Sequence, residues 1–144
     1  MLKVQFSSAD RSLTLRNKTK IKEFIEQLFK KEKKQLSSLH YIFCSDPYLL
    51  EINKQFLNHD YYTDIITFDL SEDAVKKGIE GEVYISLDRI KDNAKQENAS
   101  YTEEALRVIF HGALHLCGYK DKKKSEIEVM RQKEEYYLQL FEKQ

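Results

Sequence analysis

The central helix of this chain is predicted by residues 102–121, which read TEEALRVIFHGALHLCGYKD. Its apolar residues recur at the three- and four-residue spacing of one helix face: Leu106, Ile109, Phe110, Ala113 and Leu114. The polar stretch 102–104 opens the helix, and Gly118 is well placed to end it. The segment therefore predicts an apolar helix with a sharp stop.

Two histidines of this helix lie four residues apart, so His111 and His115 project from the same face. Two neutral imidazoles at that spacing can bind one divalent metal ion. The turn after Gly118 brings Asp121 back toward this face, which predicts a third ligand. Two histidines and one carboxylate leave a coordination position open for water, as in catalytic zinc sites. Cys117 lies on a different face, so we do not expect it to be a ligand.

A simpler interpretation is that both histidines are only polar residues of an amphipathic helix. The metal site is favoured because the pair is half of the 4 histidines in the chain and because an acid follows the helix-ending glycine. The other two, His40 in a strand-like run and His59 in a loop-like stretch, are expected to be ordinary core or surface residues.

Gly112 stands where metallopeptidases of the His-Glu-x-x-His type carry their general base. A peptidase of that class would lack its base, so the sequence argues against peptide hydrolysis. A glycine inside a helix costs about 1 kcal/mol relative to alanine. We therefore expect something to approach the backbone closely here, either a packed neighbour or a substrate.

The segments around this helix alternate between strand and helix patterns. Strands are predicted at residues 3–7, 39–44, 65–68 and 83–85, and helices at 18–33, after Pro47, at 87–97, at 102–117 and from 125 onward. Side chains expected to cap these helices are Asn17, Ser45, Ser86 and the pair Ser125 and Glu128. Strands separated by helices predict a mixed sheet with helical cover in one domain, although the pattern leaves the strand order open.

The composition fits one compact domain of 144 residues. Lys and Arg number 24, as do Asp and Glu, which argues against a polybasic binder whose affinity depends on bulk charge. Cys44 and Cys117 lie in apolar runs, so we expect buried free thiols rather than a redox pair. With no charged-then-apolar leader and no apolar stretch of about 18 residues, a soluble cytoplasmic protein is expected.

The motif His-Gly-x-Leu-His-Leu-x-Gly-Tyr at residues 111–119, with an acid-bearing turn and a long acidic helix after it, resembles the signature of the YbeY family of bacterial rRNA maturation factors. Two upstream segments are similar to further family motifs: LN at 57–58 with TDIITF at 63–68, and GEVYIS at 81–86. Glu126, Met130 and Glu134 continue the match, so the resemblance runs from about Glu51 to Glu134.

The resemblance implies one metal-dependent hydrolase domain over residues 1–144. Its fold would be α+β, a mixed four-stranded sheet covered by about five helices, with the metal site at the end of the central helix. Family members are metal-dependent endoribonucleases for single-stranded RNA that act in small-subunit rRNA 3′-end maturation and ribosome quality control. The implied cofactor is one divalent ion, Zn²⁺ first, with Ni²⁺ or Mn²⁺ as alternatives. The implied partners are ribosomal RNA and the small ribosomal subunit, with neither a membrane nor DNA expected.

The chain departs from the family pattern at several positions. Asp121 occupies the place of the third metal-binding histidine, and Lys120 the place of an aspartate. Glu82 stands where Asp is usual. The family's arginine in the segment before Thr63 has no counterpart that spacing identifies, and the catalytic residues stay unassigned.

Three hypotheses for the function follow. The first is a metal-assisted endoribonuclease in which Lys120, Lys122 and Lys123 attract phosphates to the rim of the site, although such lysines can equally form a solvated turn. The second is a ribosome-assembly factor with a structural metal and little or no nuclease activity. The missing arginine favours the second, and the open three-ligand geometry favours the first. Hydrolysis of another ester or amide is the third.

Overall fold

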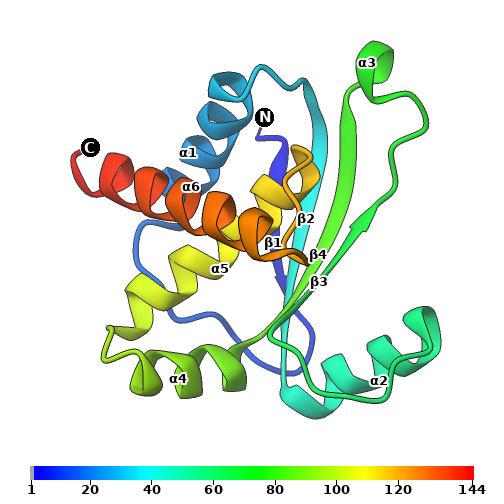
Figure 1. Ribbon diagram of the computed structural model, residues 1–144, viewed down its shortest axis with the longest axis vertical. Helices are drawn as coiled ribbons and strands as arrows, with labels where there is room; N and C mark the ends of the chain where they lie inside the picture. The colour runs from blue at the N-terminus through cyan, green and yellow to red at the C-terminus, as the bar shows by residue number, and fades with distance from the viewer. Residues whose placement is uncertain (1) are drawn as a thin grey trace.

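The computed structural model describes residues 2–144, which form a domain around one four-stranded sheet (Figure 1). The strands are β1 (Val4–Ser8), β2 (Leu36–Cys44), β3 (Ile65–Asp69) and β4 (Ile79–Ser86). They lie in the order β1-β2-β4-β3, with β1, β2 and β4 parallel and β3 antiparallel to β4. The expected mixed sheet is confirmed.

Six helices surround the sheet, one more than expected, and together they confirm the α+β class. They are α1 (Lys18–Lys31), α2 (Asp46–Leu57), α3 (Ala74–Lys77), α4 (Leu87–Gln96), α5 (Tyr101–Leu116) and α6 (Lys124–Glu142). Helices α1, α4, α5 and α6 lie on one side of the sheet, and α2 lies on the other (Figure 1). The unexpected helix, α3, is a single turn of 4 residues between β3 and β4, too short to show a periodic pattern.

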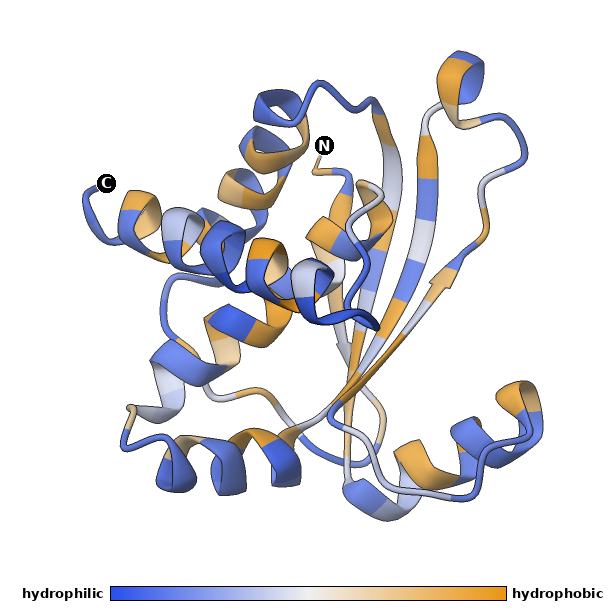
Figure 2. Cartoon of the chain, in the orientation of Figure 1, coloured by the Kyte–Doolittle hydropathy of each residue, from blue (hydrophilic) through white to orange (hydrophobic). Residues whose placement is uncertain are grey.

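The main core lies between the sheet and helices α1, α5 and α6, whose apolar faces turn inward (Figure 2). All five apolar residues of α1 at helical spacing are buried: Ile21, Phe24, Ile25, Leu28 and Phe29. A buried polar contact joins the layers, because the Tyr41 hydroxyl of β2 donates to the Ile109 carbonyl of α5 at 2.7 Å.

Two of the expected helix caps are wrong. Asn17 precedes α1 but its side chain makes no capping hydrogen bond, since its backbone has turned into the left-handed region (φ 58°). Helix α6 begins at Lys124, ahead of the expected cap at Ser125, because the Glu126 side chain accepts the Lys123 backbone N–H at 2.9 Å. Ser45 and Ser86 do cap α2 and α4.

Strands β2 and β4 extend further toward their amino ends than the apolar pattern predicts. Residues 79–82 of β4 include Glu80, Gly81 and Glu82, yet they pair with β2 from Leu36 to His40. Hydrogen bonds to a neighbouring strand hold a central strand extended even where its side chains alternate with charge or glycine.

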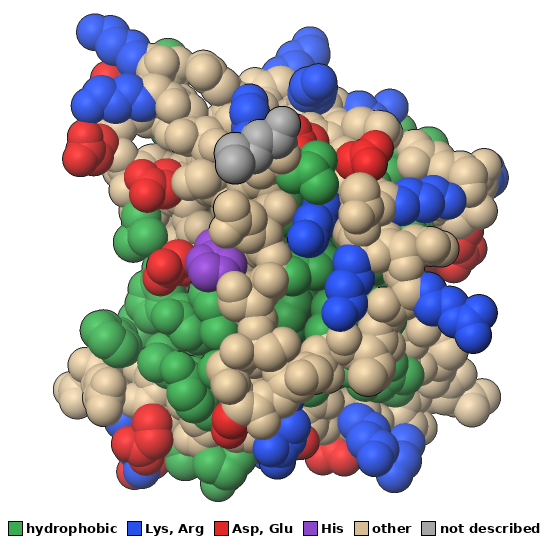
Figure 3. Space-filling view, turned by 180° about the vertical axis from the view of Figure 1, so that it is seen from behind, with side chains coloured by type: hydrophobic (Ala, Val, Ile, Leu, Met, Phe, Trp, Pro, Cys, Tyr) green, Lys and Arg blue, Asp and Glu red, His purple; other side chains and the backbone are tan. Residues whose placement is uncertain are grey.

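The rear face of the molecule is mixed in character. Figure 3 shows hydrophobic side chains gathered in its lower half, with basic and acidic side chains interspersed around them. No helix within residues 2–144 is long and apolar enough to cross a membrane. The mixed surface agrees with the balanced composition.

Helix α5 packs closely on the sheet, and this contact explains the glycine at position 112. A Cβ at this position would lie 3.0 Å from Val83 Cγ1 of β4 and 3.2 Å from Ile65 Cδ1 of β3. Gly81 of β4 faces the same helix, and a Cβ there would lie 2.6 Å from Leu116 Cδ1. Packed neighbours therefore account for the glycine at position 112, and no substrate need approach its backbone.

Gly112→Ala should destabilise the fold by about 1–3 kcal/mol, because overpacking outweighs the better helix propensity of alanine. Urea unfolding of the metal-free protein measures this. Adding Val83→Ala makes room for the new methyl group, so the double variant should lose less free energy of unfolding than the sum of the two single variants. Strict additivity would show that the Gly112–Val83 contact is not the cause.

Candidate functional site

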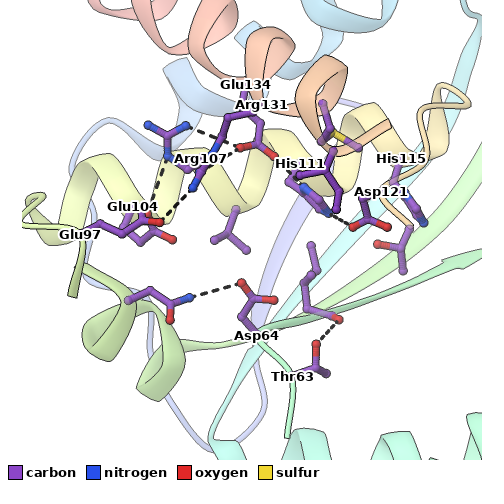
Figure 4. A pocket seen from close by; sticks show the side chains of 16 residues that line it. Thr63, Asp64, Glu97, Glu104, Arg107, His111, His115, Asp121, Arg131 and Glu134 are labelled. Carbon is purple, nitrogen blue, oxygen red and sulfur yellow. Dashed lines mark hydrogen bonds and ion pairs between the residues drawn. The ribbon is translucent and has the colours of Figure 1, made fainter. Parts of the chain in front are cut away.

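The end of α5 presents the predicted metal ligands. The rings of His111 and His115 lie nearly parallel, at 13°, with their centroids 6.0 Å apart. The helix ends at Leu116, and Gly118 takes a left-handed backbone (φ 112°) that reverses the chain. As a result Asp121 Oδ2 comes to 3.1 Å from His111 Nε2 (Figure 4).

These three residues line one cavity of about 430 Å³. Its walls are α5, α6, the end of α4 and the residues from Thr63 to Thr67 at the start of β3. In the structure His111 and Asp121 are in contact, while His115 is exposed at the rim. Within residues 2–144, no three His, Cys, Asp or Glu side chains are grouped closely enough to form a ready metal site. The ligand set therefore stays a prediction.

A fourth residue, Glu134 of α6, forms a hydrogen bond with the His111 ring. Its Oε2 lies 2.7 Å from His111 Nδ1, and the residue is only 5% exposed. Because Nδ1 contacts Glu134, Nε2 is the ring nitrogen that faces Asp121 and the cavity. Metal-binding histidines are commonly fixed by a carboxylate in this way. Sequence reasoning missed this role, because 23 positions separate the two residues and only the fold joins them.

Two arginines of the cavity are paired with carboxylates. Arg107 lies one turn before His111 on α5, and its nearest oxygen is Glu135 Oε2 at 3.1 Å. Arg131 of α6 lies 3.0 Å from Glu97 Oε1. Both also approach Glu134 Oε1, at 3.6 and 3.7 Å. The four-residue spacing of Arg107 from His111 was a sequence signal that placed it on this face.

Burial and charges around the cavity shift the pKa of His111 and of Asp64. Burial by itself would lower the pKa of His111, but the hydrogen bond to Glu134 and the charges of Glu134, Asp121 and Asp64 raise it overall. Asp64 lies across the cavity from His111 (Figure 4), and burial raises the pKa of its carboxyl group despite the opposing charge of His111.

Glu104 is a buried acid of the cavity, and Arg107 Nε lies 3.8 Å from its Oε1. The residue is 4% exposed, and its Oε1 has no hydrogen-bond partner within residues 2–144. Burial raises the pKa of Glu104 to about 7, with Glu97 and Asp64 adding to the rise and Arg107 and Arg131 opposing it. Nothing in the sequence signals this burial, because Glu104 stands in the polar stretch 102–104 that opens the helix.

The other residues considered from the sequence lie outside the cavity. Lys120, Lys122 and Lys123 are exposed on the loop that carries Asp121, and none of them lines the cavity. His40 hydrogen-bonds Ser7 Oγ at 2.6 Å on the sheet, as an ordinary polar residue would. Both cysteines are buried free thiols, as expected.

Glu104→Gln should make the stability of the protein less dependent on pH. The pKa of Glu104 is about 7 in the folded protein against an ordinary 4.5, so between these values the folded state keeps a proton that the unfolded chain loses. Wild-type stability is therefore lost as pH rises through this window, by about 2 kcal/mol from this group. Denaturant unfolding at pH 4.5 and pH 8 should show the variant gaining relative to wild type at pH 8.

The control for this experiment is Glu103→Gln, the same change on a neighbouring residue that does not line the cavity. It should run parallel to the wild type at both pH values. An equal pH dependence for Glu104→Gln and the wild type would show that Glu104 is ionised in the folded protein.

Comparison with known proteins places the chain in a family. The family model described as "Endoribonuclease YbeY" matches residues 3–142. A protein of Cytophaga hutchinsonii called Endoribonuclease YbeY is 51% identical over 135 residues, 94% of this chain and 93% of that protein. Its namesake in Flavobacterium johnsoniae is 42% identical over 89% of this chain and 90% of its own length.

A solved structure agrees with these sequence matches. The solution structure of TM1509 from Thermotoga maritima superposes with a TM-score of 0.68 at 28% identity, covering 96% of this chain and 88% of that one. The strand order, the cavity at the end of α5 and these matches lead to one conclusion. This chain belongs to the YbeY family of endoribonucleases.

Proposed function

We propose that this protein is a metal-dependent endoribonuclease that cleaves single-stranded RNA in the maturation of the small-subunit rRNA 3′ end and in ribosome quality control. Membership of an RNA-cleaving hydrolase family supports the reaction class. The observation that carries the metal dependence is the contact of 3.1 Å between His111 Nε2 and Asp121 Oδ2 in the cavity that His115 also lines. Action on rRNA implies the small ribosomal subunit as partner and the cytoplasm as location.

The residues present fit one divalent ion in chemical kind. Two imidazoles and one carboxylate are borderline donors that suit Zn²⁺, with Ni²⁺ and Mn²⁺ as alternatives. His111 is already turned so that Nε2 faces Asp121, because Glu134 binds its other nitrogen. His115 would complete the set from the next turn of the helix. When bound, such an ion polarises a phosphoryl oxygen or activates a water molecule.

Other side chains of the protein would orient a metal ligand, bind phosphate and exchange a proton. Glu134 keeps the His111 ring in one orientation. Arg131, whose side chain is 55% exposed, is the cationic group of the cavity most open to a substrate phosphate. Glu104, with a pKa of about 7, is suited to exchange a proton near neutral pH. Lys120, Lys122 and Lys123 would draw the RNA backbone toward the rim.

A second function keeps support from one observation. Both cavity arginines are paired with carboxylates, so a phosphate would have to compete with these carboxylates for either guanidinium group. Such a cavity also suits a ribosome-assembly factor in which the metal is structural and nuclease activity is weak or absent. The two functions differ in one measurable outcome, which is whether RNA is cut at a rate that depends on the metal ligands.

The metal ligands are tested by substitution. The wild type should bind one divalent ion per chain, and His111→Ala or His115→Ala should abolish stoichiometric binding. Asp121→Ala should weaken binding by at least tenfold, because two protein ligands remain, whereas Asp121→His should retain the ion. Chelator competition and elemental analysis measure this. Equal affinity of the wild type and both Asp121 variants would remove Asp121 from the ligand set.

The reaction is tested with purified protein loaded with Zn²⁺ or Mn²⁺. It should cut unpaired segments of ribosomal RNA, leave duplex RNA intact and show no peptidase activity, because Gly112 stands where the peptidase base would be. The His115→Ala protein, prepared in parallel, is the control for contaminating nucleases. If metal-loaded wild type and this control cut equally slowly while both bind the small subunit, the assembly-factor function is the correct one.

A further inference from the structure

The loop that carries Asp121, residues 118–123, is anchored to the protein at a point other than the metal site. Two residues before Asp121, Tyr119 packs against the main core. Its hydroxyl donates to Glu32 Oε1 at 2.6 Å, at the end of α1. Its backbone N–H also donates to the Leu114 carbonyl of α5, at 3.2 Å. Tyr119 thus ties the loop to α1 through its side chain and to α5 through its backbone.

Glu32 is the centre of this anchor. Its side chain is 9% exposed and accepts hydrogen bonds from Tyr119, from Tyr137 of α6 and from Lys133 Nζ at 3.2 Å. Burial would raise the pKa of Glu32, but the hydrogen bonds from the two tyrosines and Lys133 lower it overall, so the group is an anion at neutral pH. Hydrogen bonds to an ionised acceptor are the stronger kind.

The other end of the loop is held as well. The Lys123 backbone N–H donates to the Glu126 side chain at 2.9 Å, where α6 begins. Only residues 120–122 therefore span the distance between two fixed points, with Asp121 in the middle. The side chain of Asp121 is 40% exposed, and within residues 2–144 its ion-pair partner is His111 alone. Little besides the two anchors decides where its carboxylate lies.

We propose that Glu32, acting through the Tyr119 hydroxyl, is a positioning residue for Asp121 and sets the affinity of the metal site. The inference rests on the proposed metal ligands and goes beyond them, because it assigns control of the site to the end of α1. The tyrosine hydroxyl touches neither the ligands nor the cavity. It acts by limiting where the loop can place the carboxylate.

The structure offers a matched pair of variants. Tyr119→Phe and Tyr137→Phe each remove one hydroxyl that donates to Glu32, but only Tyr119 lies on the Asp121 loop. Tyr119→Phe should weaken Zn²⁺ binding roughly tenfold, the lower end of the range for loss of a group behind a metal ligand. Tyr137→Phe should stay within about twofold of the wild type. Chelator competition measures affinity, and thermal unfolding of the metal-free proteins checks that each variant is folded.

A double-mutant cycle separates positioning from general loosening of the fold. If Tyr119 acts through Asp121, then Tyr119→Phe should have no further effect on Zn²⁺ affinity in the Asp121→Ala background. An unchanged affinity of Tyr119→Phe, an equal loss in Tyr137→Phe, or the same loss in the Asp121→Ala background would each overturn the inference.

A readout without metal tests the anchor independently of the proposed function. In the metal-free protein, nitrogen NMR of the His111 ring reports its contact with Asp121. Tyr119→Phe should weaken that contact, and Tyr137→Phe should leave it in place. If the wild type binds no metal at its histidines, the proposed function and the affinity control both fall. If metal binds and only the Tyr119 effect is missing, the inference alone falls.

Discussion

Helix α5 packs closely on the sheet, with a glycine on each side of the contact. Gly112 of the helix faces Val83 and Ile65, while Gly81 of β4 faces Leu116. This close contact limits both the distance between α5 and β4 and the rotation of α5 about its own axis. His111 is next to Gly112 in the chain, so it is directed away from this contact, into the cavity between α5 and α6. The other parts of the site are arranged around this helix, whose position is restricted by its contacts with the sheet.

The cavity combines a large excess of acid with two paired arginines. Five carboxylates line it, from Asp64, Glu97, Glu104, Asp121 and Glu134, against the guanidinium groups of Arg107 and Arg131. An acidic cavity would repel a phosphate in the absence of bound cations or protons. The pKa of Glu104, which burial raises to about 7, reduces this negative charge near neutral pH. A divalent ion between His111 and Asp121 would reduce it further, which links the acidity of the site to its proposed metal.

Local patterns in the sequence predicted most of the fold. The strands, five of the six helices and the buried stripes of α1 and α5 follow from periodicity and capping, since each depends on residues near one another in the chain. The caps of α1 and α6 differ from expectation because of the left-handed backbone of Asn17 and because the Glu126 side chain accepts the Lys123 N–H. The strand order depends on contacts between distant segments, so the pattern left it open.

The sequence by itself determined that His111 and His115 share a helix face, because a spacing of four residues is one helical turn, and that the chain reverses at Gly118. Only the tertiary structure decided what surrounds them. Glu134 lies behind His111, and Glu32 is joined to Tyr119 across 87 positions of the chain. Helix packing brings these pairs together, and no local rule relates their positions in the sequence. The carboxylates that orient the predicted ligands were therefore visible only in the fold.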